Sequence, residues 1–524
     1  MESQRPGTAF RMPPWPNYAF ETSDMIIVRL KESTENTSQT QGLTTPLLLL
    51  EPLVGLDSQT DASTIPGDSY HSCNYYQLDK IEDGHQHEGV EHNTPSEDTG
   101  LPKGETTDLS ESKLVLDFGL ATYRFDRYKS SSRKTTDETD KFGDKQSTQT
   151  PTAHQSLSPG IKLVSDALSS EEQVLLDSTY WIQDMISTPA RDFTPVILQE
   201  TAETWASEHS DRVKINTVIG EDLLSFNGPI ADGQGCGMIY AVGQGAMHNV
   251  DRQPRLIHLR YDPPEEATQG HEDNSKDPKE KSVGGCIHLV GKGVTYDTGG
   301  LNLKPGKSML YMRKDMGGAA HALGLMRSLV ECCFPLPLEL WLPAVENVLG
   351  ADSFRPGDVI TGVTGKTTEI GNTDAEGRLV MSDALCMASA NKDCLAVFDF
   401  ATLTGAARVA LGPDVPAVFT NRPDDFMTRL REAAVSERDP LWELPLWNGY
   451  RPLLDSKLAD LNNVSDTALA GAITAALYLQ EFVRIGVPWM HMDLYGLNDK
   501  TKHGRAQGFR AMHRFLLDMY GRRH

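Results

Sequence analysis

The chain has 524 residues and carries 49 Lys+Arg against 73 Asp+Glu, which gives a formal net charge of −24. At roughly 100–200 residues per domain, this length predicts two or three domains. The excess of negative charge argues against nucleic acids and anionic membrane surfaces as partners, because both attract basic surfaces. The sequence contains no run of about 18 apolar residues, so no membrane-spanning helix is predicted.

Cysteine usage and the first residues of the chain bear on the cellular compartment. The seven cysteines are sparse, odd in number and without a CxxC pair, which is typical of free thiols in a reducing compartment. Residues 1–16 lack the apolar core of a secretory signal, and Glu2, Glu21 and Asp24 do not fit a basic transit peptide. We therefore expect a cytoplasmic protein, with the mitochondrion as the alternative.

Residues 1–168 are expected to form a smaller N-terminal α/β domain with disordered insertions. Residues 86–112 and 129–159 are rich in Glu, Thr, Ser, Gly and Pro and poor in large apolar side chains. Such segments cannot bury enough apolar surface to offset the entropy lost on ordering, so both are predicted to be disordered. Between them, apolar residues recur at helical spacing over residues 114–128, which predicts one amphipathic helix.

Residues 169–524 are expected to form a larger C-terminal domain that begins with a linker helix. A Ser-Ser-Glu-Glu start predicts a helix over residues 171–185, and Thr194-Pro195 opens another that continues to Trp205. Farther along, buried strands are predicted at 286–290, 338–344 and 396–401, with helices at 318–330 and 379–390. This alternation predicts an α/β fold whose mixed, largely parallel sheet is covered by helices.

Charged residues gather in two loops of this domain. In α/β sheets, ligands bind beyond the carboxyl ends of the strands, and the first loop, residues 291–315, follows a predicted strand. The second loop, residues 372–378, reads NTDAEGR and precedes an apolar helix. The charged members are Lys292, Asp297, Lys304 and Asp315 in the first loop and Asp374, Glu376 and Arg378 in the second. On an extended loop, carboxylates two residues apart point the same way.

Four carboxylates and three cations in these two loops allow two interpretations. A surface salt-bridge network is the simpler one. The apolar and glycine-rich flanks instead indicate a crowded, partly buried place, where four carboxylates would repel one another unless cations joined them. A divalent metal would remove that repulsion, and oxygen ligands with at most one amine would accept zinc, manganese, cobalt or magnesium.

Three motifs of the C-terminal domain occur together and in a fixed order. Val290–Ala320 contains VGKGVTYDTGG, a lysine and DMGGAA, Asn372–Leu379 reads NTDAEGRL, and Ala401–Ala406 reads ATLTGA. These motifs resemble the signature of the leucyl (cytosol) aminopeptidase family, over roughly residues 169–524. The resemblance implies a catalytic domain that hydrolyses the N-terminal residue from peptides, and hence a metalloprotease of the exopeptidase class.

The resemblance also implies two divalent metal ions per subunit, with Zn²⁺ and Mn²⁺ as the candidates. Lys292, Asp297, Asp315 and Glu376 would hold the tighter ion. Asp297, Asp374 and Glu376 would hold the second, so Asp297 and Glu376 would bridge the pair. Lys292 can be a ligand only as a neutral amine, so the metal would have to lower its pKa far below the usual value of about 10.4.

The catalytic roles are likewise implied by the resemblance. A water between the metals would become hydroxide-like and attack the peptide carbonyl. Lys304 would stabilise the developing oxyanion. Arg378 would hold a bicarbonate ion that transfers the proton as a general base. One metal would receive the free α-amine of the substrate, which restricts cleavage to the N-terminal residue.

The pocket for the first side chain of the substrate is implied by position. Its expected residues are Met312, Asn372, Thr402, Leu403 and Gly405. The later segment MDLYGLND departs from the family pattern, because Tyr495 stands where a small residue is common and Asn498 stands where leucine-preferring members have Met. The preferred N-terminal residue therefore stays open.

Two other functions stay open as well. One is a catalytically silent scaffold with the same fold. The other is a different di-metal hydrolase, such as a phosphoesterase, because dinuclear oxygen-rich sites serve both chemistries. The family usually forms hexamers, so we expect a homohexamer whose substrates are short peptides.

Overall fold

The computed structural model describes residues 168–264, 267 and 285–521, together with 26–31, 47–52, 75–77 and single positions between 116 and 128. Residue contacts divide the chain into two compact units, Met1–Gln173 and Val174–His524. The insertions predicted at 86–112 and 129–159 lie outside the described residues. In the part that is described, no helix is both long and apolar enough to cross a membrane.

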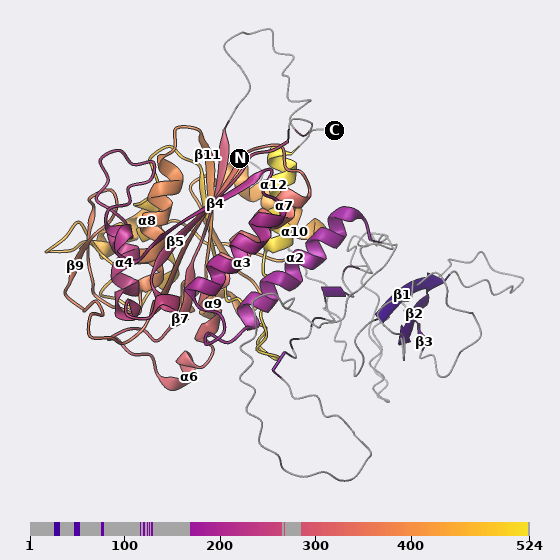
Figure 1. Cartoon of the computed structure of the whole chain (residues 1–524), viewed down its shortest axis with the longest axis horizontal. Coiled ribbons are helices and arrows are strands. Elements are labelled where there is room, and N and C mark those ends of the chain that lie inside the picture. The colour runs from indigo at the N-terminus through magenta and orange to yellow at the C-terminus, as the bar shows by residue number, and fades with distance from the viewer. Residues whose placement is uncertain are drawn as a thin grey trace, which may run out of the picture. The chain divides into compact units, whose positions relative to one another are not determined.

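The first unit contains a three-stranded antiparallel sheet. Its strands, in spatial order, are β1 (Ile26–Lys31), β2 (Leu47–Pro52) and β3 (Tyr75–Gln77) (Figure 1). The prediction of one helix over residues 114–128 is wrong for the second half of that segment. Leu116, Gly119 and Leu120 are helical, whereas Tyr123 and Phe125 are not. Alternating aromatic residues favour extended backbone over helix. The prediction rested on the spacing of apolar residues alone and did not include this preference.

The two helices predicted at the start of the C-terminal domain are confirmed. They are α2 (Ser170–Ser187) and α3 (Pro195–Glu208). At the start of α2 the Ser169 hydroxyl accepts from the Glu172 N–H at 3.2 Å, and the Ser169 N–H donates to Glu172 Oε2 at 3.0 Å. This reciprocal pair satisfies backbone donors that the first helical turn leaves free. Pro195 fits the first turn of α3, where its missing N–H costs no hydrogen bond.

A nine-stranded mixed sheet forms the centre of the second unit. In spatial order its strands are β13 (Trp442–Glu443), β12 (Ala417–Thr420), β15 (Trp489–Asp493), β11 (Cys394–Ala401), β6 (Cys286–Gly291), β8 (Leu338–Asn347), β5 (Arg255–Tyr261) and β4 (Val213–Ile219), with β7 (Gly293–Asp297) also paired to β8. The central neighbours β15, β11, β6 and β8 run parallel. β12 pairs antiparallel with β15, β5 pairs antiparallel with β8, and β4 pairs antiparallel with β5. The predicted mixed, largely parallel sheet is confirmed.

Helices cover both faces of this sheet (Figure 1). Further α-helices are α4 (Gly237–Gly243), α6 (Gly306–Met309), α7 (Gly317–Glu331), α8 (Glu376–Ala390), α9 (Gly405–Leu411), α10 (Thr428–Ser436), α11 (Gly471–Gln480) and α12 (Phe509–Tyr520). One apolar core packs α2, α3, α7, α10 and α12 on the face that carries Ile287 and Leu289. The other packs α4, α8 and α11 on the face that carries Val290 and Trp341. Side chains alternate between faces along each strand, as the strand period requires.

The pairing of β6 and β7 with β8 positions Lys292. β6 pairs with the first half of β8, and β7 pairs with the second half of β8. Lys292 is the single residue between β6 and β7. The Lys292 N–H donates to the Phe400 carbonyl on β11 at 2.9 Å, and its carbonyl accepts from the Ala319 N–H on α7 at 2.8 Å. Lys292 is therefore fixed between β11 and the start of α7, where the carboxyl ends of the parallel strands meet.

A small second sheet flanks the site, with strand order β14 (Leu461–Asn462), β10 (Thr367–Glu369) and β9 (Val359–Thr361). The loop after β10 carries the NTDAEGR segment into α8. Asn463, which follows β14, accepts from the Gly371 N–H at 2.8 Å and donates to the Asn372 carbonyl at 2.7 Å. These contacts fix the loop that leads to Asp374 and Glu376.

Candidate active site

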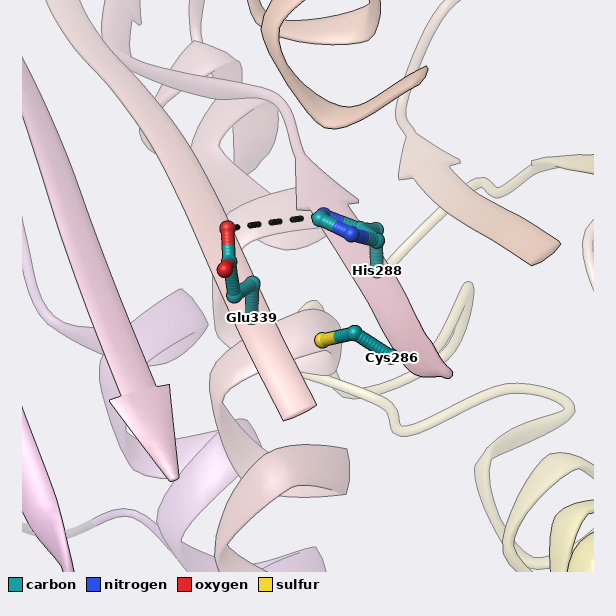
Figure 2. A group of neighbouring side chains, drawn as sticks. All are labelled: Cys286, His288 and Glu339. Carbon is teal, nitrogen blue, oxygen red and sulfur yellow. Dashed lines mark ion pairs between the residues drawn. The ribbon is translucent and has the colours of Figure 1, made fainter. Parts of the chain in front are cut away.

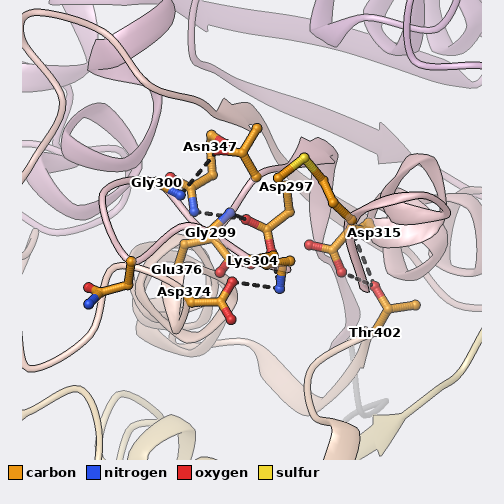
Figure 3. Close-up of polar contacts among 12 residues, drawn as sticks. Asp297, Gly299, Gly300, Lys304, Asp315, Asn347, Asp374, Glu376 and Thr402 are labelled. Carbon is orange, nitrogen blue, oxygen red and sulfur yellow. Dashed lines mark hydrogen bonds and ion pairs between the residues drawn. The ribbon is translucent and has the colours of Figure 1, made fainter. Parts of the chain in front are cut away.

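The two charged loops predicted from the sequence meet at the carboxyl ends of the central strands (Figure 3). Asp297 is the last residue of β7, and Asp315 lies in the short 3₁₀ helix η5 (Met312–Met316). Glu376 opens α8, with Asp374 two residues before it. Lys292 completes the group between β6 and β7. Three separate parts of the chain therefore contribute to one site.

Lys292 holds two of the carboxylates together. Its Nζ lies 2.8 Å from Asp315 Oδ2 and 2.9 Å from Glu376 Oε1, and all three side chains are buried. Burial opposes the charge of Lys292, but the nearby Asp315, Glu376 and Asp297 outweigh burial and raise its pKa. Lys292 is accordingly an ammonium ion in this arrangement, and a metal would have to displace its proton before the nitrogen became a ligand.

Lys304 joins the other two carboxylates. Its Nζ lies 2.8 Å from Asp297 Oδ2 and 2.5 Å from Asp374 Oδ1. Burial again opposes the charge, and Asp297 and Glu376 are the leading groups that raise the Lys304 pKa. Lys304 is only slightly exposed, and Asp374 is the most exposed of the four carboxylates. The open side of the site is therefore at Lys304 and Asp374.

The acidic charge of the site exceeds what these two lysines can neutralise. Burial and the neighbouring Asp297 raise the pKa of Glu376 to about 8, and burial and Asp315 raise the pKa of Asp297 to about 6. Among the described residues, the buried Glu376 Oε2 has no hydrogen-bond partner. One carboxylate oxygen from each of Asp297, Asp374 and Glu376 lies within 4.8 Å of the others. Buried, crowded oxygen ligands of this kind fit divalent metal ions.

Uncharged groups orient the carboxylates (Figure 3). Asp297 Oδ1 accepts from Asn347 Nδ2 at 2.8 Å and from the Gly299 N–H at 2.8 Å. The Thr402 hydroxyl donates to Asp315 Oδ1 at 2.8 Å. Groups that hydrogen-bond to metal ligands fix the ligand orientation, and their loss typically weakens metal binding. These hydrogen bonds thus fix the orientation of the Asp297 and Asp315 carboxylates.

Arg378 is a buried cation close to this group. Its Nη1 donates to the Asn463 carbonyl at 2.7 Å, and its Nε has no hydrogen-bond partner within the described part of the chain. Burial lowers its pKa, with small opposing contributions from Tyr478 and Glu376. A guanidinium is a strong donor to planar anions, so its free donor group can receive a small anion.

Of the residues predicted for the substrate pocket, Thr402 and Asn372 contact carboxylate residues of the site, and the others follow or precede residues of the site in the chain. Thr402 and Leu403 follow β11, and the Leu403 N–H donates to Asp493 Oδ1 at 3.0 Å. The Asn372 side chain accepts from the Asp374 N–H at 2.8 Å, so it supports the loop as well. Met312 begins η5, which also carries Asp315, and Gly405 begins α9, which follows the Thr402–Thr404 segment.

Three residues of the site were missed by the sequence prediction. Asn347 orients Asp297, Asn463 fixes the loop before α8, and Asp493 accepts from the Leu403 and Thr404 N–H groups. Asn347 and Asp493 each end a buried strand, β8 and β15, and a polar residue at the end of a buried strand is a signal that could have found them. Asn463 carries no comparable signal.

Comparison with known proteins agrees with this geometry. The profile of the cytosol aminopeptidase family, catalytic domain, matches residues 180–515. A probable cytosol aminopeptidase from Chlamydia trachomatis serovar A is 37% identical over 338 residues, which are 64% of this chain and 61% of that protein. The match thus spans less than two thirds of that relative.

Two solved structures share the fold. The crystal structure of the cytosol aminopeptidase from Coxiella burnetii is similar with a TM-score of 0.62 and 38% identity, and the match covers 78% of this chain and 77% of that one. The bottromycin maturation enzyme BotP in complex with Mn is similar with a TM-score of 0.62 and 29% identity, over 78% and 79% of the two chains. With the family profile matching well over half of its residues, this chain belongs to the cytosol aminopeptidase family.

Proposed function

We propose that this protein is a leucyl-type metallo-aminopeptidase, which hydrolyses the N-terminal residue from short peptides. The observation that carries the proposal is the buried group of Asp297, Asp374 and Glu376, whose carboxylate oxygens crowd together beside two lysines that cannot neutralise them all. Family membership supports the same activity.

The proposed metal ligands fall into two overlapping sets. Lys292, Asp297, Asp315 and Glu376 would hold one ion, and Asp297, Asp374 and Glu376 would hold the other. When bound, paired divalent ions would polarise the scissile carbonyl and lower the pKa of a water. Manganese and zinc both suit these ligands, and a similar structure is named as a complex with Mn.

The chain itself supplies the remaining chemistry in this proposal. The Lys304 ammonium lies at the open side of the site, 2.5 Å from Asp374, where it would stabilise negative charge on the carbonyl oxygen of the substrate. Arg378 would hold a bicarbonate ion through its unpartnered donor, and a bicarbonate held there would supply the general base.

The pocket for the substrate side chain would be formed by Met312, Asn372, Thr402, Leu403 and Gly405. Gly496, the residue after Tyr495, lies next to this set, because a Cβ added there would meet the Thr402 methyl at 3.3 Å. The Tyr495 ring has the Arg408 guanidinium 4.0 Å from its centroid and Lys314 Nζ 5.5 Å away. Burial lowers the Lys314 pKa to about 8, so the side chain is mostly charged at neutral pH, and its charge is poorly screened there. We therefore propose a preference for acidic over basic N-terminal residues.

Assembly, compartment and domain organisation stay predictions from the sequence and the family resemblance. A homohexamer in the cytoplasm, or alternatively in the mitochondrion, is the proposed state, with residues 1–168 as a separate N-terminal domain and residues 169–524 as the catalytic domain. Light scattering of the purified chain tests the hexamer, since a stable monomer would contradict it.

The activity is tested with a substrate panel. The protein, loaded in turn with zinc, manganese or cobalt, is assayed on aminoacyl amides, short peptides and phosphoesters. Release of N-terminal residues that chelator abolishes and added metal restores supports the proposal. Inertness toward every peptide substrate would favour a silent scaffold, and turnover of phosphoesters alone would favour a different di-metal hydrolase.

A further inference from the structure

A second group of metal-ligating side chains lies on the central sheet, away from the active site. Figure 2 shows Cys286 and His288 on one strand, β6, facing Glu339 on the neighbouring strand β8. One ligand atom from each of the three lies within 4.8 Å of the others, and all three residues are buried. Residues two apart on a strand project from the same face, which explains how Cys286 and His288 share this place.

Glu339 presents one oxygen to this group. Its Oε1 is paired with Arg260 Nη1 at 2.8 Å. Its Oε2 lies 3.2 Å from His258 Nε2 and 3.6 Å from His288 Nδ1. The carboxylate is thus anchored through one oxygen, and its other oxygen faces two imidazoles. Burial opposes its charge, but the hydrogen bond with His258 and the nearby Arg260 guanidinium keep the Glu339 pKa below its usual value, so the carboxylate is ionised and able to bind a cation.

His288 is available as a ligand. Its side chain is fully buried, and its Nε2 has no hydrogen-bond partner within the described residues. Its Nδ1 accepts only a long contact of 3.4 Å from the Trp341 indole N–H, whereas a good N–H donor lies at about 2.9–3.0 Å. Burial lowers the His288 pKa to about 4, so the imidazole is neutral at physiological pH, as a metal ligand must be.

The surroundings resemble the outer partners of a metal site. The Trp341 ring stacks on His258, with centroids 3.8 Å apart and planes 18° apart, while its N–H points to His288. His258 in turn contacts the carboxylate of Glu339. His258 is a partner of the kind that orients a metal-bound carboxylate. The Trp341 N–H can only donate, so an ion bound at His288 Nδ1 would have to replace its long contact. A thiolate, an imidazole and a carboxylate together form a ligand set that zinc accepts readily. Burial raises the pKa of the Cys286 thiol, so the bound ion would displace its proton.

We propose that Cys286, His288 and Glu339 bind one divalent zinc-type ion, which links the beginning of β6 to β8 and is additional to the metals of the active site. The two places are distinct. His288 precedes Lys292 by four residues, which is about 13 Å along a strand. The active-site ligands of this chain are oxygens and one lysine nitrogen, whereas the proposed site contains sulfur. The ion would fix the strand that leads into Lys292.

The sulfur ligand makes the site measurable without any assay of activity. Cobalt(II) bound by a thiolate gives a strong near-ultraviolet charge-transfer band, which oxygen and nitrogen ligands do not give. Full-length protein freed of metal is titrated with Co²⁺ until the band stops growing, and its final intensity is expected to be that of one thiolate-bound ion per chain. The same band should appear in Glu376→Gln protein, because that change touches only the active site. Failure of the proposed aminopeptidase activity would leave this result unaffected.

Substitutions test whether the charge-transfer band comes from Cys286, His288 and Glu339. Cys286→Ser should abolish it, and His288→Gln should weaken Co²⁺ binding at least tenfold. Cys394→Ser is the matched control, because Cys394 lies opposite Cys286 on β11 and is not a member of the group, so the band should persist. The proposal is overturned if the wild-type protein shows no thiolate band, or if the band survives in Cys286→Ser protein. The wild-type result stands even if a variant folds poorly.

Discussion

Gly377, the second residue of α8, lies directly against the end of the Lys292 side chain. A Cβ added at Gly377 would lie 2.6 Å from both Cε and Nζ of Lys292. Ordinary contact begins at 3.4 Å, so the lysine end would have to move by about 0.8 Å, the difference between the two distances. Because Nζ lies between Asp315 and Glu376, the change Gly377→Ala would separate it from both carboxylates.

We expect Gly377→Ala to lower kcat/KM about 100-fold, because a misplacement on the order of 1 Å at a reacting centre costs about that much. Stability should change little, since alanine favours a helix over glycine by up to about 1 kcal/mol and the flexible lysine end can give way. The assays are peptide hydrolysis and urea unfolding of the same preparations.

Gly306→Ala is the matched control for this change, because an added Cβ there would meet nothing within 4 Å. The control should keep wild-type activity. Unchanged kcat/KM in Gly377→Ala protein would refute the role given to Lys292. A large loss of stability in that variant would instead show that the lysine cannot move, and that the site is more rigid than the side-chain geometry indicates.

Three further perturbations test the fold, the ligand orientation and the residue preference. His321 donates to the Gly317 carbonyl at 2.6 Å and accepts from the Gln507 N–H at 2.9 Å, and burial lowers its pKa to about 4. In the unfolded chain the histidine pKa is near 6.5, so between pH 6.5 and 4 the unfolded state binds more protons than the folded state. As the pH falls through that window, His321 should therefore lower the free energy of unfolding by about 3 kcal/mol. In urea titrations over this pH range, the His321→Gln variant should lose less unfolding free energy than the wild type. An equal pH dependence of stability in the two proteins would contradict the buried, neutral state of His321. Thr402→Val removes the donor to Asp315 and should weaken metal binding about 10- to 100-fold in calorimetry, whereas unchanged affinity would remove its orienting role. Lys314→Met should lower kcat/KM for N-terminal Glu about tenfold relative to Leu, and an unchanged ratio would exclude its charge from substrate selection.

Local signals in the sequence predicted the main elements of the C-terminal domain. The strand predicted at 286–290 is β6, Cys286–Gly291, and the helix predicted at 379–390 is the larger part of α8, Glu376–Ala390. Apolar runs and capping residues act within a few positions, so these elements can be read directly from the chain. The charged loops could also be found, because their carboxylates and lysines stand close together in sequence.

Contacts between distant parts of the chain could not be predicted. The end of a buried strand marks Asn347 as a candidate, but its partner Asp297 lies 50 residues away, and Asn463 lies 85 residues from Arg378, so neither pairing is visible in a local pattern. The Cys286, His288 and Glu339 group escaped notice for the same reason, since it depends on the pairing of β6 with β8. Such pairings follow from the packing of the whole sheet.

The central claim, a metal-dependent aminopeptidase site built on Glu376, is tested most directly by one rate. Release of N-terminal residues from short peptides is measured for the wild-type protein and for Glu376→Gln, loaded with the same divalent ion. We predict steady release by the wild type and only background release by the variant, because an amide cannot replace a carboxylate between two ions. A Glu376→Gln protein that works at close to the wild-type rate would contradict the claim.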